Sequence, residues 1–216
     1  MNRVIIIGAG GHARVIVDCL QQIRGIRIYG ILERDRTQWG KKVWGVPIIG
    51  GDDLLPGMKK QKVDYFVVGV GGIGDNRPRQ KLFEIGQANG LQPLIVKHPS
   101  AVCSKWVRVG GGCQLLANSV VNPGSELGMN VIINTGAIIE HDCKIGAHAH
   151  ISPGTVLCGG VRVGTGAHIG VGAVVRQGIN IGESAIVGAG AVVVKDVLAG
   201  SVVAGVPARI MRKAGK

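Results

Sequence analysis

The chain has 216 residues, which corresponds to one or two domains, and it carries a formal net charge of +12 at pH 7. The basic excess is spread over both halves, with 15 basic and 8 acidic residues in 1–98 and 10 and 5 in 99–216. Because no basic run is interleaved with aromatic residues, the charge favours small polyanions over nucleic acid as partners.

Nothing in the chain predicts export or a membrane span. The sequence shows no apolar run of about 18 residues and no recognisable signal peptide. Its five cysteines are odd in number and form no CxxC pair. We therefore expect free thiols and a cytoplasmic protein.

Residues 1–90 predict a small α/β unit. Val4–Ile7 is a continuous apolar run, as expected for a buried strand of a parallel sheet. Ala13–Gln22 has its apolar residues on one helical face. Further strands are predicted at Ile26–Leu32, Tyr65–Val70 and Leu91–Val96, and a further helix at Arg77–Ala88. The alternation of strands and helices predicts a parallel sheet.

A glycine-rich turn, Gly8–His12, joins the first predicted strand to the first helix. Backbone N–H groups and a helix N-terminus attract phosphate at such a turn. The turn matches GxGxxG with Ala13 in the last place, and Glu33 lies about twenty residues further on, as in a dinucleotide fingerprint. Fewer than 100 residues precede the repeats described next, which is enough for one mononucleotide-binding half. A nucleotide diphosphate is therefore favoured over NAD and over a purely structural turn.

From Val109 to Val193 every sixth residue is aliphatic, in fifteen consecutive positions. This period is typical of a hexapeptide β-helix. Glycines recur every eighteen residues at Gly110, Gly128, Gly146, Gly164 and Gly182. Eighteen residues should therefore form one triangular coil, with a glycine at the same corner because positive φ or tight packing suits it. The coils are predicted over Ala101–Val197, after a boundary at His98-Pro99-Ser100.

Glu140-His141-Asp142 places titratable groups in an otherwise bland coil. An imidazole can accept a proton near neutral pH, and a neighbouring carboxylate fixes its tautomer. Gly159 follows His141 by eighteen residues, so it should stack beside it at the strand spacing of about 4.8 Å. A free N–H of Gly159 or Gly160 would then make an oxyanion donor beside a base. The alternative is that His141 is a solvated corner residue.

The same spacing predicts that His150 stacks on His168. The pair has no third ligand in the sequence, so packing is favoured over a metal site and no metal is predicted. His150 lies nine residues from His141 and is an auxiliary candidate.

Four stretches together resemble one family over the whole chain. They are Ile6–Val15, His98–Ala101, Asn134-Thr135 with Ile139–Asp142, and Val203–Arg209. They are similar to the sialic acid O-acetyltransferases (NeuD-like) and amino-sugar N-acetyltransferases (PglD-like and PerB-like). The resemblance implies a Rossmann-like α/β half domain at 1–97 that binds a nucleotide sugar. It implies a left-handed parallel β-helix with a C-terminal tail at 98–216, a homotrimer, and acetyl-CoA between neighbouring coils.

The resemblance also implies roles for individual residues. His141 resembles the general base, and Asp142 the residue that polarises it. The implied substrate-binding residues are Gly8, Gly10, Gly11, His12, Glu33, Arg34, Gly71, Asn76, Arg79 and Asn134. The implied acetyl-CoA contacts are His150, Gly159, Ala189, Pro207 and Arg209. Family members often carry two acidic residues where this chain has Glu33-Arg34-Asp35, which leaves the nucleotide base open.

The expected function is therefore acetyl-CoA-dependent N-acetylation of a UDP- or GDP-linked amino-deoxy sugar, for surface glycan or glycoprotein synthesis. The amine would attack the thioester directly, with assistance from His141. Two alternatives stay open: O-acetylation of a sialic-acid-like sugar, and a non-catalytic, nucleotide-binding trimeric scaffold.

Overall fold

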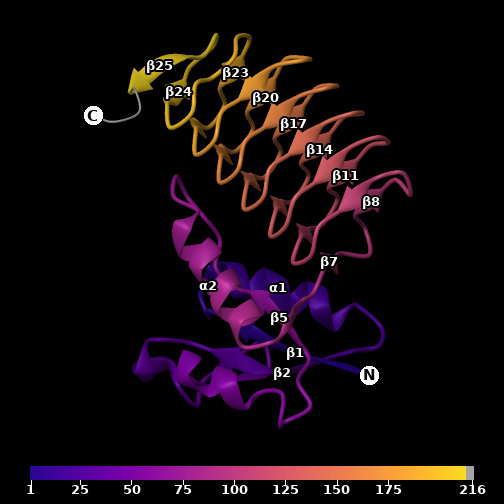
Figure 1. Ribbon diagram of the computed structural model, residues 1–216, viewed down its shortest axis with the longest axis vertical. Coiled ribbons are helices and arrows are strands. Elements are labelled where there is room, and N and C mark those ends of the chain that lie inside the picture. The colour runs from indigo at the N-terminus through magenta and orange to yellow at the C-terminus, as the bar shows by residue number, and fades with distance from the viewer. Residues whose placement is uncertain (213–216) are drawn as a thin grey trace.

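The computed structural model describes residues 1–212, so residues 213–216 of the predicted tail lie outside it. An α/β unit at the N-terminus is followed by a long prism of stacked strands, and helix α2 runs close to the prism (Figure 1). Within the described residues no helix has the length and apolar character needed to cross a membrane.

The α/β unit is built on one six-stranded sheet. Its order is β3 (Lys42–Val43), β4 (Val46–Gly50), β2 (Ile26–Leu32), β1 (Asn2–Ile7), β5 (Tyr65–Val68) and β6 (Gln92–Pro93). All pairs are parallel except the β3–β4 hairpin. The connections contain α1 (Gly11–Gln21), α2 (Arg77–Ala88) and two short 3₁₀ helices, Arg36–Gln38 and Asp52–Gly57. The predicted parallel sheet is confirmed.

Side chains of β1 alternate between two buried layers, as the two-residue period of a strand requires. Val4 and Ile6 pack in the layer that contains α1, whereas Ile5 and Ile7 pack in the layer that contains α2. Because both faces of the sheet are covered there, the central strand is apolar and buried from Val4 to Ile7.

The predicted strand at Leu91–Val96 is wrong as a single element. Gln92–Pro93 remains in the α/β sheet as β6, and Leu94 still donates its N–H to the Phe66 carbonyl. Val96–Lys97 (β7) instead pairs with Gln114-Leu115 and forms the first rung of the prism. The chain leaves the α/β sheet after Pro93 and enters the prism at Val96. One apolar run can supply strands to both sheets because each of these strands needs only two residues.

The prism has three parallel sheets, one on each face. The first contains β7, β10 (Gln114–Leu115), β13 (Ile132–Ile133), β16 (His150–Ile151), β19 (His168–Ile169), β22 (Ile186–Val187) and β24 (Val202–Ala204), with β25 (Arg209–Arg212) antiparallel at its end. The second contains β8 (Val102–Cys103), β11 (Val120–Val121), β14 (Ile138–Ile139), β17 (Val156–Leu157), β20 (Val174–Val175) and β23 (Val192–Val193). The third contains β9 (Arg108–Val109), β12 (Glu126–Leu127), β15 (Lys144–Ile145), β18 (Arg162–Val163) and β21 (Asn180–Ile181).

Within the regular coils, paired residues lie eighteen apart, as in Gln114 with Ile132 and Ile132 with His150. The predicted eighteen-residue coil is confirmed. The sixfold aliphatic positions fill one continuous buried core along the axis of the prism. Backbone N–H groups pair with carbonyls of the next coil, so each coil supports its neighbours and the structure repeats.

The glycines that recur every eighteen residues are not explained by the positive φ of the corners. From residue 112 to 190 every sixth residue has a φ between +52° and +77°, and Asp142 is one of these. The glycines at steps of eighteen are in another register and have no such φ. A Cβ on Gly128 would lie 2.6 Å from the Ala147 nitrogen in the next coil. Of the two reasons considered, tight packing therefore explains these glycines.

The outer faces of the three sheets differ in chemistry. The first lies against the α/β unit, because its Gln114 and His150 hydrogen-bond to Val68 and Gly72 of that unit. The second carries only aliphatic side chains: Val102, Val120, Ile138, Val156, Val174 and Val192. The third carries Arg108, Glu126, Lys144, Arg162 and Asn180.

Candidate active site

His141 and Asp142 form a hydrogen-bonded pair on the edge between the second and third sheets. Nδ1 of His141 lies 2.9 Å from Oδ2 of Asp142, and their side chains are 58% and 71% exposed. Asp142 has a φ of +60°, which aspartate tolerates better than most residues. Because a carboxylate oxygen can only accept, Nδ1 carries the proton and donates it. Nε2 of the neutral ring is then left to accept a proton.

Gly159 lies directly against the His141 ring, as the eighteen-residue spacing predicted. A Cβ at this position would lie 2.6 Å from Cε1 and from Nε2, so only glycine leaves room for the imidazole. The Gly160 N–H donates to the His141 carbonyl oxygen at 2.9 Å. The Gly159 N–H has no hydrogen-bond partner among residues 1–212. Of the two candidate amides, only Gly159 is therefore available to a ligand beside the base.

A second group of predicted residues meets in a cavity of about 770 Å³ between the α/β unit and the first sheet. The cavity is lined by Gly10, Gly11, His12, Val15, Gly69, Val70, Gly71, Gly72, Ile73, Asn134, His150, Ser152, Pro153, His168 and Val171. Of these, Ile73 is 95% exposed. The apolar wall of this cavity was not among the predicted features, although Ile73 is an apolar residue between Gly72 and Gly74 in the sequence.

His150 is held as a neutral ring in this cavity. Its Nδ1 donates to the Gly72 carbonyl oxygen at 2.6 Å, and its Nε2 accepts from Nδ2 of Asn134 at 3.0 Å. Burial lowers the pKa of His150 to about 3. His150 is thus a fixed hydrogen-bonding group that positions Asn134, rather than a base. Its ring also lies edge-on to that of His168, at 5.2 Å between centroids, as the predicted stacking requires.

His12 is fixed in a similar way at the start of α1. Its Nε2 donates to Oε1 of Gln114 at 2.7 Å, while Nε2 of Gln114 donates to the Val68 carbonyl. Burial, and then the charge of Arg79, lower the pKa of His12 to about 4. Gln114 was not among the predicted residues, because its role depends on a contact 102 residues along the chain from His12.

The glycine-rich turn is open to a ligand at one end. A Cβ at Gly10 or Gly11 would meet no atom within 4 Å, so both backbones are accessible beside the α1 N-terminus. Gly8 has a φ of +100°, and a side chain there would overlap Val70. Glu33 accepts the Ala9 N–H at 2.7 Å, so its carboxylate supports the turn.

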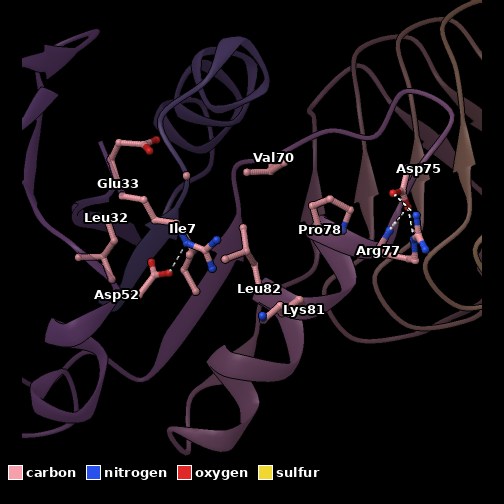
Figure 2. A pocket seen from close by; sticks show the side chains of 12 residues that line it. Ile7, Leu32, Glu33, Asp52, Val70, Asp75, Arg77, Pro78, Lys81 and Leu82 are labelled. Atoms are coloured by element: carbon pink, nitrogen blue, oxygen red, sulfur yellow. Dashed lines mark hydrogen bonds and ion pairs between the residues drawn. The ribbon is translucent and has the colours of Figure 1, made fainter. Parts of the chain in front are cut away.

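A cavity of about 440 Å³ lies at the carboxyl ends of β1, β2 and β5, where ligands bind in parallel α/β sheets. Arg34 pairs with Asp52 at 3.2 Å, and Arg77 pairs with Asp75 at 2.8 Å. Figure 2 shows Asp52 at one end of this cavity and the Asp75–Arg77 pair at the other, beside the prism. Hydrogen bonds from Arg77 lower the pKa of Asp75 to about 2.

Arg79 and Asn76 are buried and make hydrogen bonds within the fold, and the substrate-binding role expected for them stays a prediction. Arg79 is 1% exposed and donates to the carbonyls of Val68 and Val70 at 3.1 and 2.8 Å. Burial lowers the pKa of its guanidinium to about 9. Asn76 is also buried, and its Nδ2 donates to the carbonyls of Gly166 and Ala167 in the prism. Both side chains therefore join segments of the fold, and Asn76 also lines a cavity of about 280 Å³ between the start of α2 and the prism.

The sequence did contain a signal for the burial of Arg79. It precedes Leu82 and Phe83 by three and four residues, so it shares their apolar helix face.

The remaining predicted residues lie on other parts of the prism. Ala189 is on the edge between the first and second sheets, the same edge as Asn134, and is therefore separated from His141. Pro207 and Arg209 follow β24 at the far end, where Arg209 lines a cavity of about 470 Å³. Within residues 1–212 no three His, Cys, Asp or Glu side chains gather into a metal-binding group.

Three family models match the chain. They are the PglD N-terminal domain over residues 3–85, the bacterial transferase hexapeptide (six repeats) over 125–159 and 142–177, and the hexapeptide repeat of succinyl-transferase over 160–195. PerB from Caulobacter crescentus, solved in complex with CoA and GDP-perosamine, is 42% identical with a TM-score of 0.91, and the match covers 98% of both chains. The chain belongs to the PglD/PerB-like family of hexapeptide-repeat N-acetyltransferases.

Further PglD/PerB-like relatives agree with this assignment. The acetyltransferase domain of PglB from Neisseria gonorrhoeae FA1090, solved with acetyl coenzyme A, is 38% identical with a TM-score of 0.90 over 98% of this chain and 100% of that one. GDP-perosamine N-acetyltransferase from Escherichia coli O157:H7 is 34% identical over 149 residues, or 67% of this chain. The match spans 64% of that relative, which is less than two thirds of its length.

Proposed function

We propose that this chain transfers the acetyl group of acetyl-CoA to the amino group of a nucleotide-linked amino sugar, with His141 as general base. The observation that carries the proposal is the position of the His141 ring against a Gly159 N–H that has no partner among residues 1–212. A base and an oxyanion donor on adjacent coils are the two groups that aminolysis of a thioester requires.

The reaction then follows from these groups. The amine nitrogen attacks the thioester carbonyl carbon as Nε2 of His141 takes its proton. The carbonyl oxygen gains negative charge and accepts the Gly159 N–H. When the intermediate collapses, the carbon–sulfur bond breaks, the nitrogen–carbon bond remains, and the proton passes to the CoA thiolate. Asp142 stabilises the imidazolium through its hydrogen bond to Nδ1.

Structures of the Caulobacter relative include its H141N and H141A mutants with CoA and GDP-perosamine, which supports a reacting histidine in this family.

The nucleotide would bind to the α/β unit. The open backbones of Gly10 and Gly11 at the α1 N-terminus suit a diphosphate. Arg34 and Asp52, at the carboxyl end of the sheet, supply the donor and acceptor groups that a guanine edge pairs with. Together with the GDP-perosamine enzymes among the relatives, this favours a GDP-linked amino sugar over a UDP-linked one.

We place the sugar in the cavity that contains His12, Gly71, Asn134 and His150. His141 lies on a different edge of the prism, so one chain does not bring it to this cavity. The aliphatic outer face of the second sheet, on which Val102 and Val174 are exposed, supports burial against another copy. A homotrimer would join the His141 edge of one copy to the sugar cavity of the next. Acetyl-CoA would then lie between copies, near Gly159 on one side and Ala189 on the other.

The five cysteines are all free thiols, which fits the reducing cytoplasm expected from the sequence.

Mass spectrometry of acetyl transfer tests the function. The purified chain is given acetyl-CoA and, in separate reactions, GDP-perosamine, a UDP-linked amino sugar or a CMP-linked sialic acid. We expect an acetylated amine with GDP-perosamine. Acetylation of the sialic acid alone would favour the O-acetyltransferase alternative. Nucleotide binding by calorimetry without acetyl-CoA binding would favour the scaffold alternative.

Sedimentation tests the trimer. Val156→Glu places a charge on the aliphatic face and is expected to dissociate the assembly and lower activity by at least about tenfold, since burying an unpaired charge is unfavourable. Arg162→Glu, at an exposed outward position of the third sheet beside Lys144, is the matched control and should sediment as wild type.

A further inference from the structure

The corner that carries His141 is closed differently from two other corners on the same edge. In Ser104–Val107 and Arg176–Ile179, the N–H of the last residue donates to the carbonyl of the first, at 3.1 and 3.4 Å. In Glu140–Cys143 the hydroxyl of Ser125 takes the place of this bond. It donates to the Glu140 carbonyl at 2.9 Å and accepts the Cys143 N–H at 3.1 Å. One hydroxyl therefore joins the two ends of the segment that contains His141 and Asp142.

Ser125 differs from the residues at equivalent positions of other coils. It is 1% exposed, and the equivalent positions of the other coils are Val107, Cys143, Val161 and Ile179. Cys143 makes a related contact, because its Sγ donates to the Cys158 carbonyl at 3.3 Å, whereas the other three side chains are aliphatic. A buried hydroxyl is unfavourable unless its hydrogen bonds are made, and Ser125 makes two, both to this corner. Ser125 is thus the one hydroxyl at this position of the coils, and it lies in the coil next to His141 and Asp142.

The neighbours of Ser125 support the same corner. The Pro123 carbonyl accepts the Asp142 N–H at 3.1 Å. A Cβ at Gly124 would overlap Oδ1 of Asp142, so the absence of a side chain leaves room for the carboxylate. Residues 123–125 therefore support the pair from one side, while Gly159 lies against it on the other.

We infer that Ser125 is a positioning residue for the His141–Asp142 pair, with Gly124 providing the space for the carboxylate. This inference rests on the proposed role of His141 as general base. Without the hydroxyl, the Cys143 N–H and the Glu140 carbonyl lose their shared partner, and the corner can relax. The imidazole then moves relative to the Gly159 amide, and a displacement of about 1 Å can lower a rate by roughly a hundredfold.

The test uses two substitutions of the same shape. Ser125→Thr keeps the hydroxyl, whereas Ser125→Val removes it, and the valines at 107 and 161 show that the coil accepts a β-branched side chain at this position. We expect Ser125→Val to lower kcat/KM by about ten- to a hundredfold, and Ser125→Thr to stay within about threefold of wild type. Ser119→Ala is the matched control, because Ser119 is buried in the neighbouring corner and its hydroxyl has no partner among the described residues. It should match wild type.

The split between kcat and KM separates positioning from mere structural support. A misplaced imidazole slows the chemical step while both substrates can still bind, so Ser125→Val is expected to lower kcat and leave KM near wild type. Ser125→Thr should change neither. In the His141→Ala background, Ser125→Val should cause no further loss.

Two results would overturn the inference alone while the proposed function stands: His141→Ala inactive but Ser125→Val equal to wild type, or Val and Thr variants that lose activity equally through a raised KM with kcat unchanged. Full activity of His141→Ala would overturn both the proposed function and the role of Ser125.

Discussion

His141 and His150 are nine residues apart in the chain, yet the prism places them in opposite surroundings. His141 lies on an open corner with a carboxylate on Nδ1. His150 lies beneath the α/β unit, where a carbonyl and an amide take both ring nitrogens and burial lowers its pKa to about 3. The comparison shows how one coil supplies two kinds of imidazole. The exposed ring can exchange a proton, and the buried ring can only hold a neighbour in place.

The largest expected effect tests whether His141, on the open corner, is the histidine that reacts. His141→Ala should lower turnover by at least about a hundredfold, because general base catalysis contributes roughly 10²–10⁴-fold. The fold should persist because the ring is exposed, and the circular dichroism spectrum should therefore be unchanged. Retention of full turnover would remove His141 from the mechanism.

Gly159→Ala sharpens the role of the corner. Its methyl group would lie 2.6 Å from the His141 ring, so the ring must move away from the amide. We expect kcat/KM to fall by about ten- to a hundredfold with little change in melting temperature. Gly57→Ala is the control, because a Cβ there meets no atom within 4 Å. Equal activities of the two variants would contradict the proposed geometry.

Arg79→Met tests whether a buried side chain beneath the α/β unit stabilises the fold and does not bind substrate. It removes hydrogen bonds to the Val68 and Val70 carbonyls, so the free energy of unfolding should fall by about 1–3 kcal/mol. KM for the nucleotide sugar should stay near wild type, because the side chain faces no cavity. A large rise in KM with unchanged stability would support the substrate-binding role that the family resemblance implied.

The pH dependence of stability is the smallest expected effect. Burial depresses the pKa of His150 to about 3, so below pH 6.5 the unfolded chain binds more protons there than the folded one. The contribution of His150 is thus complete above about pH 6.5 and declines as pH falls towards 3, by at most about 1.4 kcal/mol per pH unit. Denaturant unfolding of His150→Gln should show a shallower decline between pH 6.5 and 4.5 than wild type. Parallel curves for the two proteins would contradict the burial argument.

Much of the fold could be predicted because its signals are local or periodic. The helix Arg77–Ala88 has the predicted bounds, and the pairs at eighteen residues follow from the spacing of aliphatic residues. The strand Leu91–Val96 could not be divided correctly, because an apolar run does not say which of two sheets accepts it. The boundary after residue 97 stays a prediction.

The sequence by itself determined the coil and the neighbourhood of His141 and Gly159. In a solenoid each residue stacks on the one a full turn away, so the repeat length of the sequence shows which residues are neighbours in the structure. Only the tertiary structure decided that Gly160 uses its N–H while Gly159 does not, that Arg79 and Asn76 are buried, and that Ser125 closes the corner of His141. These features depend on hydrogen bonds and packing specific to one coil or one contact with the α/β unit, and a repeat does not record them.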